Sequence, residues 1–224
     1  MKLTETINSP ATTARQVIID AANWRYATKK FDPAKPLEKD DIDALLNTLR
    51  MSPTAFGLQP FHFFVIKNQP LRQELFKYAN NQRQVLDSSL FIVFAAKTRF
   101  EDDELKAFVN LNAELRNYDT GHKNSKLAKL HAFTAKLSGD ELFHWSAKQS
   151  YLAMGELISA AALMKIDACP MEGIDQKEYD RILGLELLNL GTVAAVALGY
   201  RSDTDSYQRQ PKVRKNHDDL ISTI

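Results

Sequence analysis

A short basic segment near the start of the chain carries residue types that bind an anion. It reads Arg25-Tyr26-Ala27-Thr28-Lys29-Lys30-Phe31 and follows a predicted helix. Arg25 and Lys29 stand four positions apart, so in a loop both side chains can converge on one anion, with backbone N–H groups nearby. Taken alone, such a run is more typical of a solvated loop.

A second basic segment lies near the end of the chain and reads Gln210-Pro211-Lys212-Val213-Arg214-Lys215. Residues two apart in an extended segment point to the same side, so Lys212 and Arg214 would offer two cations to one phosphate. On its own, this segment is more typical of a solvated tail. The hypothesis is that the two segments form the halves of one phosphate site.

Between them, the segment from Ser52 to His62 suits contact with a flat ligand. Pro53, Gly57 and Pro60 interrupt regular structure there, and most of its residues are small or polar. Backbone groups in such a loop can approach a ligand without bulky side chains in the way. A plain helix-to-strand connection is the alternative.

The segment Cys169-Pro170-Met171-Glu172-Gly173 follows a long predicted helix. We expect Gly173 to adopt a positive φ and to turn the chain sharply. That turn would expose the N–H groups of Glu172 and Gly173, which could bind a ring nitrogen. An ordinary turn with Glu172 in solvent is the alternative.

Composition disfavours several classes of partner. With 29 basic and 28 acidic residues the net charge is +1, so no nucleic-acid partner is expected. The apolar runs Leu90 to Ala96 and Val193 to Leu198 are too short to cross a membrane. Met1 to Asn8 has no long apolar run and is not a secretory signal. The one cysteine, Cys169, allows no internal disulfide, so a reducing, cytoplasmic location is expected.

Several catalytic signatures are missing from the sequence. The histidines show no zinc-ligand spacing, so no metal is expected. They are His62, His122, His131, His144 and His217. There is no G-x-S-x-G elbow, P-loop or G-x-G-x-x-G motif. A serine hydrolase, a nucleotide kinase and a Rossmann domain are therefore disfavoured, whereas transient use of a nicotinamide as a substrate stays open.

Hydrophobic periodicity predicts one domain over residues 1–224 with a layered α+β or α/β fold. Strands are expected at 61–67, 90–97 and 188–198. Helices are expected at 14–24, after Pro36, and at 69–78, 102–118, 124–137, 141–165 and 175–183. The helix at 141–165 should be buried nearly all round. The polar residues after Tyr200 need another surface to lie on, which suggests a dimer; a frayed terminus is the alternative.

Taken in order, these segments resemble the nitroreductase family, and more narrowly its oxygen-insensitive NAD(P)H nitroreductase and dihydropteridine reductase branch. The resemblance runs from about Asn23 to the C-terminus. Its elements are residues 25–31, Ser52-Pro53 through Gln59-Pro60-Phe61-His62-Phe63, Asn81 through Leu86-Asp87-Ser88, Trp145-Ser146-Ala147-Lys148-Gln149-Ser150-Tyr151-Leu152, Pro170-Met171-Glu172-Gly173 and Pro211-Lys212-Val213-Arg214.

The resemblance implies an α+β homodimer with a central, mainly antiparallel sheet flanked by helices. Residues 1–22 would form an N-terminal extension and helix, and residues 201–224 a tail that wraps the partner subunit. Each of two interface clefts would hold one FMN. The implied cofactor contacts are Arg25, Tyr26, Ala27, Lys29, Pro53, Thr54, Ala55, Gly57, Asn81, Gln84, Pro170, Glu172, Gly173, Lys212 and Arg214. The implied substrate contacts are Phe56, His131 and Phe133.

The same resemblance assigns roles within this set. Lys212 and Arg214 would hold the FMN phosphate together with Arg25, and Lys29 would approach the pyrimidine end of the ring. The loop from Pro53 to Gly57 would reach the flavin from the partner subunit. The N–H groups of Glu172 and Gly173 would lie at the flavin N5 region.

There are departures from the family pattern. Gln84 stands where close relatives carry a lysine, which removes one cation beside the flavin and affects its redox potential. Residues 126–133 match the segment that covers the flavin face, and either His131 or Phe133 is its aromatic residue.

The implied activity passes two electrons from NADH or NADPH through FMN to nitroaromatic, quinone or related acceptors by a ping-pong mechanism. FMN carries the chemistry, so no side chain is assigned as a catalytic acid. One alternative is a reductase of a specific enone, pteridine or quinone with incidental nitro activity. Others are a flavin-binding protein that does not turn over and a non-enzymatic anion-binding module.

Overall fold

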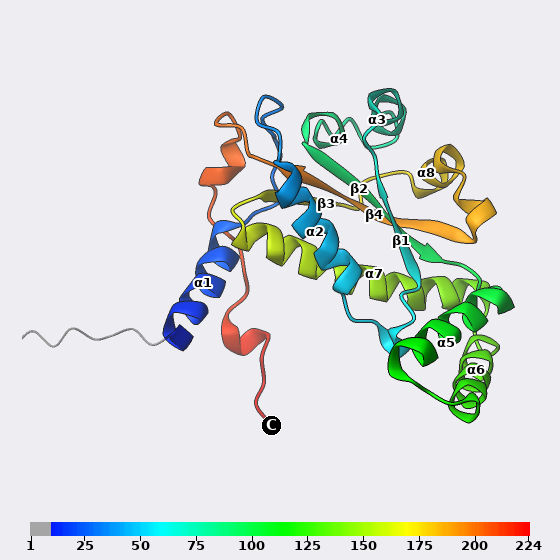
Figure 1. Cartoon of the computed structure of the whole chain (residues 1–224). Helices are drawn as coiled ribbons and strands as arrows, with labels where there is room; N and C mark the ends of the chain where they lie inside the picture. The colour runs from blue at the N-terminus through cyan, green and yellow to red at the C-terminus, as the bar shows by residue number, and fades with distance from the viewer. Residues whose placement is uncertain (1–9) are drawn as a thin grey trace, which may run out of the picture.

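A computed structural model describes residues 10–224, and its centre is a four-stranded sheet (Figure 1). The strands are β1 (Phe61–Val65), β2 (Leu90–Lys97), β3 (Asp167–Met171) and β4 (Leu190–Gly199). Their order across the sheet is β1-β2-β4-β3, and every neighbouring pair is antiparallel. The two central strands are buried on both faces, as their continuous apolar runs predict.

Helices cover both faces of this sheet. On one face α2 (Lys39–Met51) and α7 (Gly139–Leu163) pack into a core around Leu45, Leu49 and Leu157. On the other face α3 (Gln69–Phe76), the short α4 (Gln84–Asp87) and α8 (Gln176–Leu183) enclose a second core. The α+β class is therefore confirmed.

Two helical segments extend beyond these layers. A hairpin of α5 (Asp102–Arg116) and α6 (Thr120–Thr134) lies beside one end of α7 (Figure 1). At the other end α1 (Pro10–Trp24) contacts α7. The remaining helical elements are the single turns η1 (Ala55–Gly57), η2 (Leu185–Leu188), η3 (Ser206–Arg209) and η4 (His217–Asp219). The predictions for residues 1–9 lie outside the described part of the chain.

The sequence predicts no strand directly before the turn at Gly173, but Cys169, Pro170 and Met171 belong to strand β3. Proline lacks the N–H of a ladder hydrogen bond, so a run containing it reads as a turn. β3 is at the edge of the sheet, where proline is tolerated, and pairing with β4 imposes the extended backbone.

The prediction that α7 is buried nearly all round also needs correction within a single chain. Tyr151, Leu152 and Leu163 are 42%, 47% and 47% exposed along this helix. Met51 at the end of α2 is 63% exposed. The small and apolar residues of α7 therefore serve two purposes: one face packs on the sheet, and another is left open to a further surface.

A buried ion pair fixes the strand β3 to the segment that follows β4. Arg201 Nε lies 2.8 Å and 3.0 Å from the two carboxylate oxygens of Asp167, which is 3% exposed. The guanidinium is also sandwiched between the rings of Trp24 and Tyr26, at 4.3 Å and 4.6 Å. Thr28 Oγ1 donates to the same carboxylate, so this ion pair positions the loop after α1.

We predict that Asp167→Ala lowers the free energy of unfolding by about 3–5 kcal/mol, because it leaves the Arg201 charge buried without a partner. Urea unfolding followed by circular dichroism measures this change. The matched control is Asp43→Ala, which removes the exposed partner of Lys39 and should cost at most about 1 kcal/mol. Equal losses in the two variants would contradict the role given to Asp167.

No helix between residues 10 and 224 has the length and apolar character needed to cross a membrane.

Candidate functional site

The buried carboxylate of Asp205 joins the two basic segments. Its Oδ2 accepts hydrogen bonds from Tyr26 Oη at 2.9 Å, from Lys29 N–H at 2.8 Å and from Lys30 N–H at 3.2 Å. Its Oδ1 accepts from Tyr207 N–H at 3.0 Å. Asp205 is 1% exposed, so these bonds replace the water that its charge has lost. The loop after α1 and the C-terminal tail are thereby held together.

These bonds also determine the ionisation of both partners. Burial opposes the charge on Asp205, but hydrogen bonds from Lys29 N–H and Tyr26 outweigh it and hold the pKa of the carboxyl below its usual range. Burial and the adjacent Asp205 raise the pKa of the Tyr26 phenol. Tyr26 was predicted to contact FMN, but its hydroxyl is committed to Asp205. Nothing in the spacing of the tail singles this aspartate out.

Three of the predicted cations gather at the C-terminal end of α1. Lys212 Nζ donates to the carbonyl oxygens of Ala22 and Asn23, at 2.5 Å and 2.8 Å. Partial burial lowers the pKa of Lys212, and the nearby charges of Arg25 and Arg214 lower it further. Figure 1 shows the tail running beside α1.

This gathering leaves positive charge without a counterion. Across residues 10–224, Arg25, Arg214 and Lys212 form no ion pair with a carboxylate. Mutual repulsion among three cations is relieved when an anion binds between them. A phosphate group fits this donor set, because it accepts several charged hydrogen bonds at once.

A second group of predicted residues meets at Cys169 on β3. Gln84 Nε2 lies 4.0 Å from Cys169 Sγ, and both residues are buried. Burial raises the pKa of the Cys169 thiol, while the charge of Lys29 acts in the opposite direction, which places that charge nearby. Ala27 forms a parallel bridge with Ala168, so the loop runs alongside β3. The structure therefore brings Lys29 and Gln84 to the same end of this strand.

The turn after β3 lies where it was predicted, but it does not depend on a positive φ at Gly173. Gly173 does not adopt a positive φ, so that expectation is wrong. A Cβ atom at this position would lie 3.0 Å from Gln82 Nε2, which is the end of a flexible side chain and not backbone. The Gly173 carbonyl accepts from Gln82 Nε2 at 2.8 Å and from Asn80 Nδ2 at 3.1 Å. These bonds bring Asn81, which adopts φ +55°, beside the turn.

The same turn borders an open hollow of about 440 Å³ against α7. Pro170 and Glu172 line one side, and Tyr151 and Gly155 line the other. Tyr151 Oη donates to Glu172 Oε1 at 2.6 Å, and burial together with Glu172 raises the pKa of Tyr151 to about 12. Within residues 10–224, the N–H groups of Glu172 and Gly173 meet no acceptor. They are available as donors to a ligand.

The loop from Pro53 to Gly57 lies on a different side of α7. Ala55 N–H donates to Gln149 Oε1 at 3.0 Å, whereas Tyr151, two residues along the helix, faces Glu172. Residues two apart on an α-helix point roughly 200° apart. The body of α7 therefore separates this loop from the hollow at Glu172. Thr54 Oγ1 accepts from Gln59 N–H at 3.0 Å and supports the loop.

The predicted substrate contacts divide into two places. Phe56 and Phe133 have ring centres 5.1 Å apart, and Phe133 also packs on Trp145 at 4.9 Å. His131 instead binds Asp102 at the start of α5, with Nε2 2.8 Å from Oδ1. The position of Phe133 beside Phe56 favours it over His131 as the aromatic residue of the covering segment. Phe56 itself is 49% exposed and held at φ +60°, an unusual backbone conformation for an aromatic residue.

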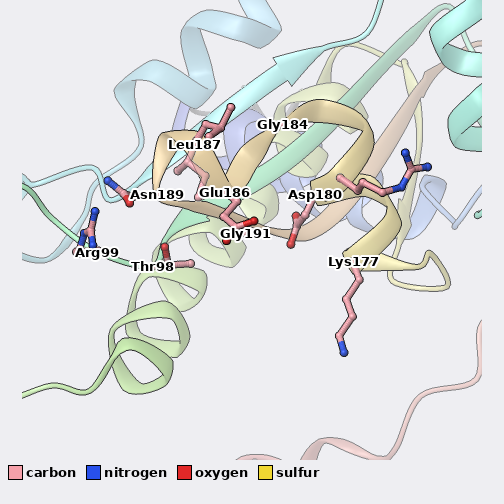
Figure 2. Close-up of a pocket in the computed structure, with 11 residues that line it drawn as sticks. Thr98, Arg99, Lys177, Asp180, Gly184, Glu186, Leu187, Asn189 and Gly191 are labelled. Atoms are coloured by element: carbon pink, nitrogen blue, oxygen red, sulfur yellow. The ribbon is translucent and has the colours of Figure 1, made fainter.

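Another hollow, of about 590 Å³, lies beside α8 and contains none of the predicted site residues (Figure 2). Lys177, Asp180 and Glu186 are among its lining residues. Asp180 has a structural task there, since its Oδ1 accepts from Thr192 N–H at 2.6 Å. In the described residues, no group of His, Cys, Asp and Glu side chains has the arrangement of a metal site.

Comparison with known proteins identifies the family. The profile of the nitroreductase family matches residues 22–200. A Staphylococcus epidermidis protein provisionally named NAD(P)H nitroreductase is 34% identical over 219 residues, which cover 93% of this chain and 97% of the relative. The chain therefore belongs to the nitroreductase family.

Solved structures show the same fold. A provisionally named nitroreductase from Bacillus subtilis superposes with a TM-score of 0.82 at 19% identity, covering 95% of this chain and 100% of that one. One from Exiguobacterium sibiricum, solved in complex with FMN, gives a TM-score of 0.80 at 19% identity, with 92% and 97% covered. The nitroreductase-like fold is thereby confirmed.

We predict that Asp205→Asn lowers the free energy of unfolding by about 2 kcal/mol at neutral pH, because a charged acceptor of four hydrogen bonds is lost. The pKa of Asp205 is depressed in the folded state, so its contribution is complete above the ordinary aspartate pKa of about 3.9 and is lost as pH falls through the folded value. Thermal unfolding of wild type and variant from pH 7 to pH 3 should show the difference shrinking at the acidic end. Asp203→Asn, a substitution in the same tail, is the control, and a difference independent of pH would contradict this assignment.

Proposed function

We propose that this protein is an FMN-dependent oxidoreductase that takes electrons from NADH or NADPH. The observation that supports this most directly is the gathering of Arg25, Lys212 and Arg214 at the end of α1, where a phosphate group would satisfy all three charges. Membership of the nitroreductase family supports the same reaction class.

The remaining residues of the cleft suit the ring of the cofactor. Lys29 and Gln84 would lie at its pyrimidine end, and the N–H groups of Glu172 and Gly173 would lie at its N5 side. When bound here, FMN would supply the two-electron hydride chemistry for a ping-pong cycle, in which the nicotinamide donor and the acceptor use the same place in turn. Lys29 would stabilise the negative charge that reduction adds to the ring.

Gln84 supplies a polar but neutral amide at this end of the site. One cation, Lys29, then faces the pyrimidine end instead of two, so the stabilisation of the added charge is weaker. We infer a lower reduction potential than in family members with lysine at this position. No side chain is needed as a proton donor, since water can reach the exposed turn at Glu172.

A second copy of the chain would complete each cleft. Pro53, Thr54, Ala55, Phe56 and Gly57 lie across α7 from Glu172, so they are separated from the hollow of their own chain. A partner whose α7 packs against this α7 would bring its own loop to that hollow. The exposed apolar residues of α2 and α7 offer the surface for such a homodimer.

We propose nitroaromatic or quinone compounds as acceptors, and a reductase of a specific enone or pteridine with incidental nitro activity as the second candidate. Comparing acceptors in steady-state assays at fixed NADH separates them. The single buried cysteine, Cys169, suits the reducing interior of a cell, where we place the protein.

We predict that the purified protein is yellow and releases about one FMN per chain on extraction. The double variant Lys212→Ala with Arg214→Ala should bind FMN at least tenfold more weakly, because two charged hydrogen bonds to the phosphate are lost. The matched control removes two other cations of the same tail, Arg209→Ala with Lys215→Ala, and should keep its affinity. A colourless protein that gains no colour with added FMN would refute the proposed function.

We predict that Leu152→Glu, which places a charge on the exposed face of α7, shifts the protein from dimer to monomer and releases FMN. Light scattering after gel filtration measures the first effect, and flavin absorbance the second. Leu187→Glu is the control, because Leu187 is 90% exposed on η2, an element that packs against β4 and α8. A monomeric Leu152→Glu variant that retains its FMN would show that one chain is sufficient to form the site.

A further inference from the structure

A basic pocket lies between the end of α5 and the outer side of α6. Its volume is about 510 Å³, and its lining includes Arg116, Lys126 and Lys129 together with Phe56. No acidic residue lines it. This pocket is distinct from the proposed FMN phosphate site, which is at the end of α1 near the opposite end of α7 (Figure 1).

The cations of this pocket are not neutralised by the protein. In the described part of the chain, Arg116, Lys126 and Lys129 take part in no ion pair. Burial lowers the pKa of Lys126, and the nearby charge of Arg116 lowers it further. Asp119, at the start of α6, is engaged by His122, whose N–H donates to Oδ1 at 2.8 Å.

Core packing does not account for this arrangement. α6 buries Leu130 and leaves most of its other residues on the surface. Arg116 is favoured at its position by the C-terminal end of α5, and Lys126 lies 4.8 Å from the ring centre of Phe108. Neither interaction removes positive charge, and Lys129 has no comparable contact among the described residues.

Aromatic side chains accompany these charges. Tyr118 stacks on His122, with ring centres 5.3 Å apart and 22° between the planes. Phe56 connects the pocket to an aromatic cluster with Phe133 and Trp145, and Phe56 and Phe133 are two of the predicted substrate contacts. Flat stacking surfaces next to several cations are the combination that a nucleotide requires.

We propose that this pocket binds the phosphate-bearing end of the nicotinamide dinucleotide, while the nicotinamide ring reaches past Phe56 toward the flavin. This inference rests on the proposed function and adds the location of the donor's anionic end. The shared ligand chemistry is a phosphate oxyanion, which either the pyrophosphate of both dinucleotides or the 2′-phosphate of NADPH can supply.

The test compares a double variant, which carries both Lys126→Ala and Lys129→Ala, with the unaltered protein, both loaded with FMN. We expect KM for the donor to rise about tenfold or more with little change in kcat at saturating donor, since charged hydrogen bonds to the bound donor are lost. A loss with NADPH alone identifies the 2′-phosphate, and an equal loss with NADH and NADPH identifies the pyrophosphate. Lys177→Ala, on α8 across the sheet, is the charge-matched control and should leave both donors unaffected.

Calorimetric titration of the same proteins with NADP⁺ and NAD⁺ gives a readout that does not require turnover. The double variant should bind at least one of them about tenfold more weakly, with unchanged FMN content and thermal unfolding. Arg116→Gln provides a second, independent variant with the same expected direction. Unchanged KM and unchanged titrations in both variants would overturn the proposal, whereas an absence of FMN from every protein, control included, would refute the proposed function instead.

Discussion

A carboxylate that is removed from water needs hydrogen-bond donors, and Asp205 finds them in both halves of the proposed phosphate site. The loop after α1 supplies a phenol and two backbone N–H groups, and the tail supplies one more. The loop therefore cannot separate from the tail without exposing or stranding this charge. Arg201 adds to this constraint, because Asp167, Trp24 and Tyr26 surround its guanidinium. The buried carboxylates of Asp205 and Asp167 thus hold in place the two segments that carry the basic residues of the proposed phosphate site.

The division of the site by α7 has a consequence for the whole assembly. Donors that suit the phosphate lie at the end of α1, and those that suit the ring edge lie along β3 and the turn after it. The loop at Pro53 to Gly57 and the cluster at Phe56 lie past the opposite side of α7. A homodimer that packs α7 against α7 would bring each loop to the partner's cleft. The apolar residues of this helix that are exposed in a single chain would then be buried in the dimer interface.

Much of the fold could be predicted from local sequence, and the exceptions have physical causes. β2 was predicted with its observed bounds because a strand buried on both faces has a continuous apolar run. β3 was not predicted, because Pro170 is more typical of a turn than of a strand. Its extended backbone comes from pairing with β4 at the edge of the sheet. At the site, spacing predicts that Lys212 and Arg214 bind a phosphate, and this stays a prediction. The role of Asp205 could not be predicted, because it depends on burial, and a single acid in a polar tail gives no sign of burial. The positive φ predicted for Gly173 is wrong, because the chain leaves β3 at this turn without adopting the left-handed conformation.

The cations at the end of α1 are proposed to bind the phosphate of the cofactor, and the proposed function depends on this contact. The most direct test is to titrate the flavin-free protein with FMN and with riboflavin, which has the same ring but no phosphate, and to follow flavin fluorescence. We expect FMN to bind at least a hundredfold more tightly, because three charged groups lose their ligand in the riboflavin complex. Equal affinity for the two flavins would contradict it.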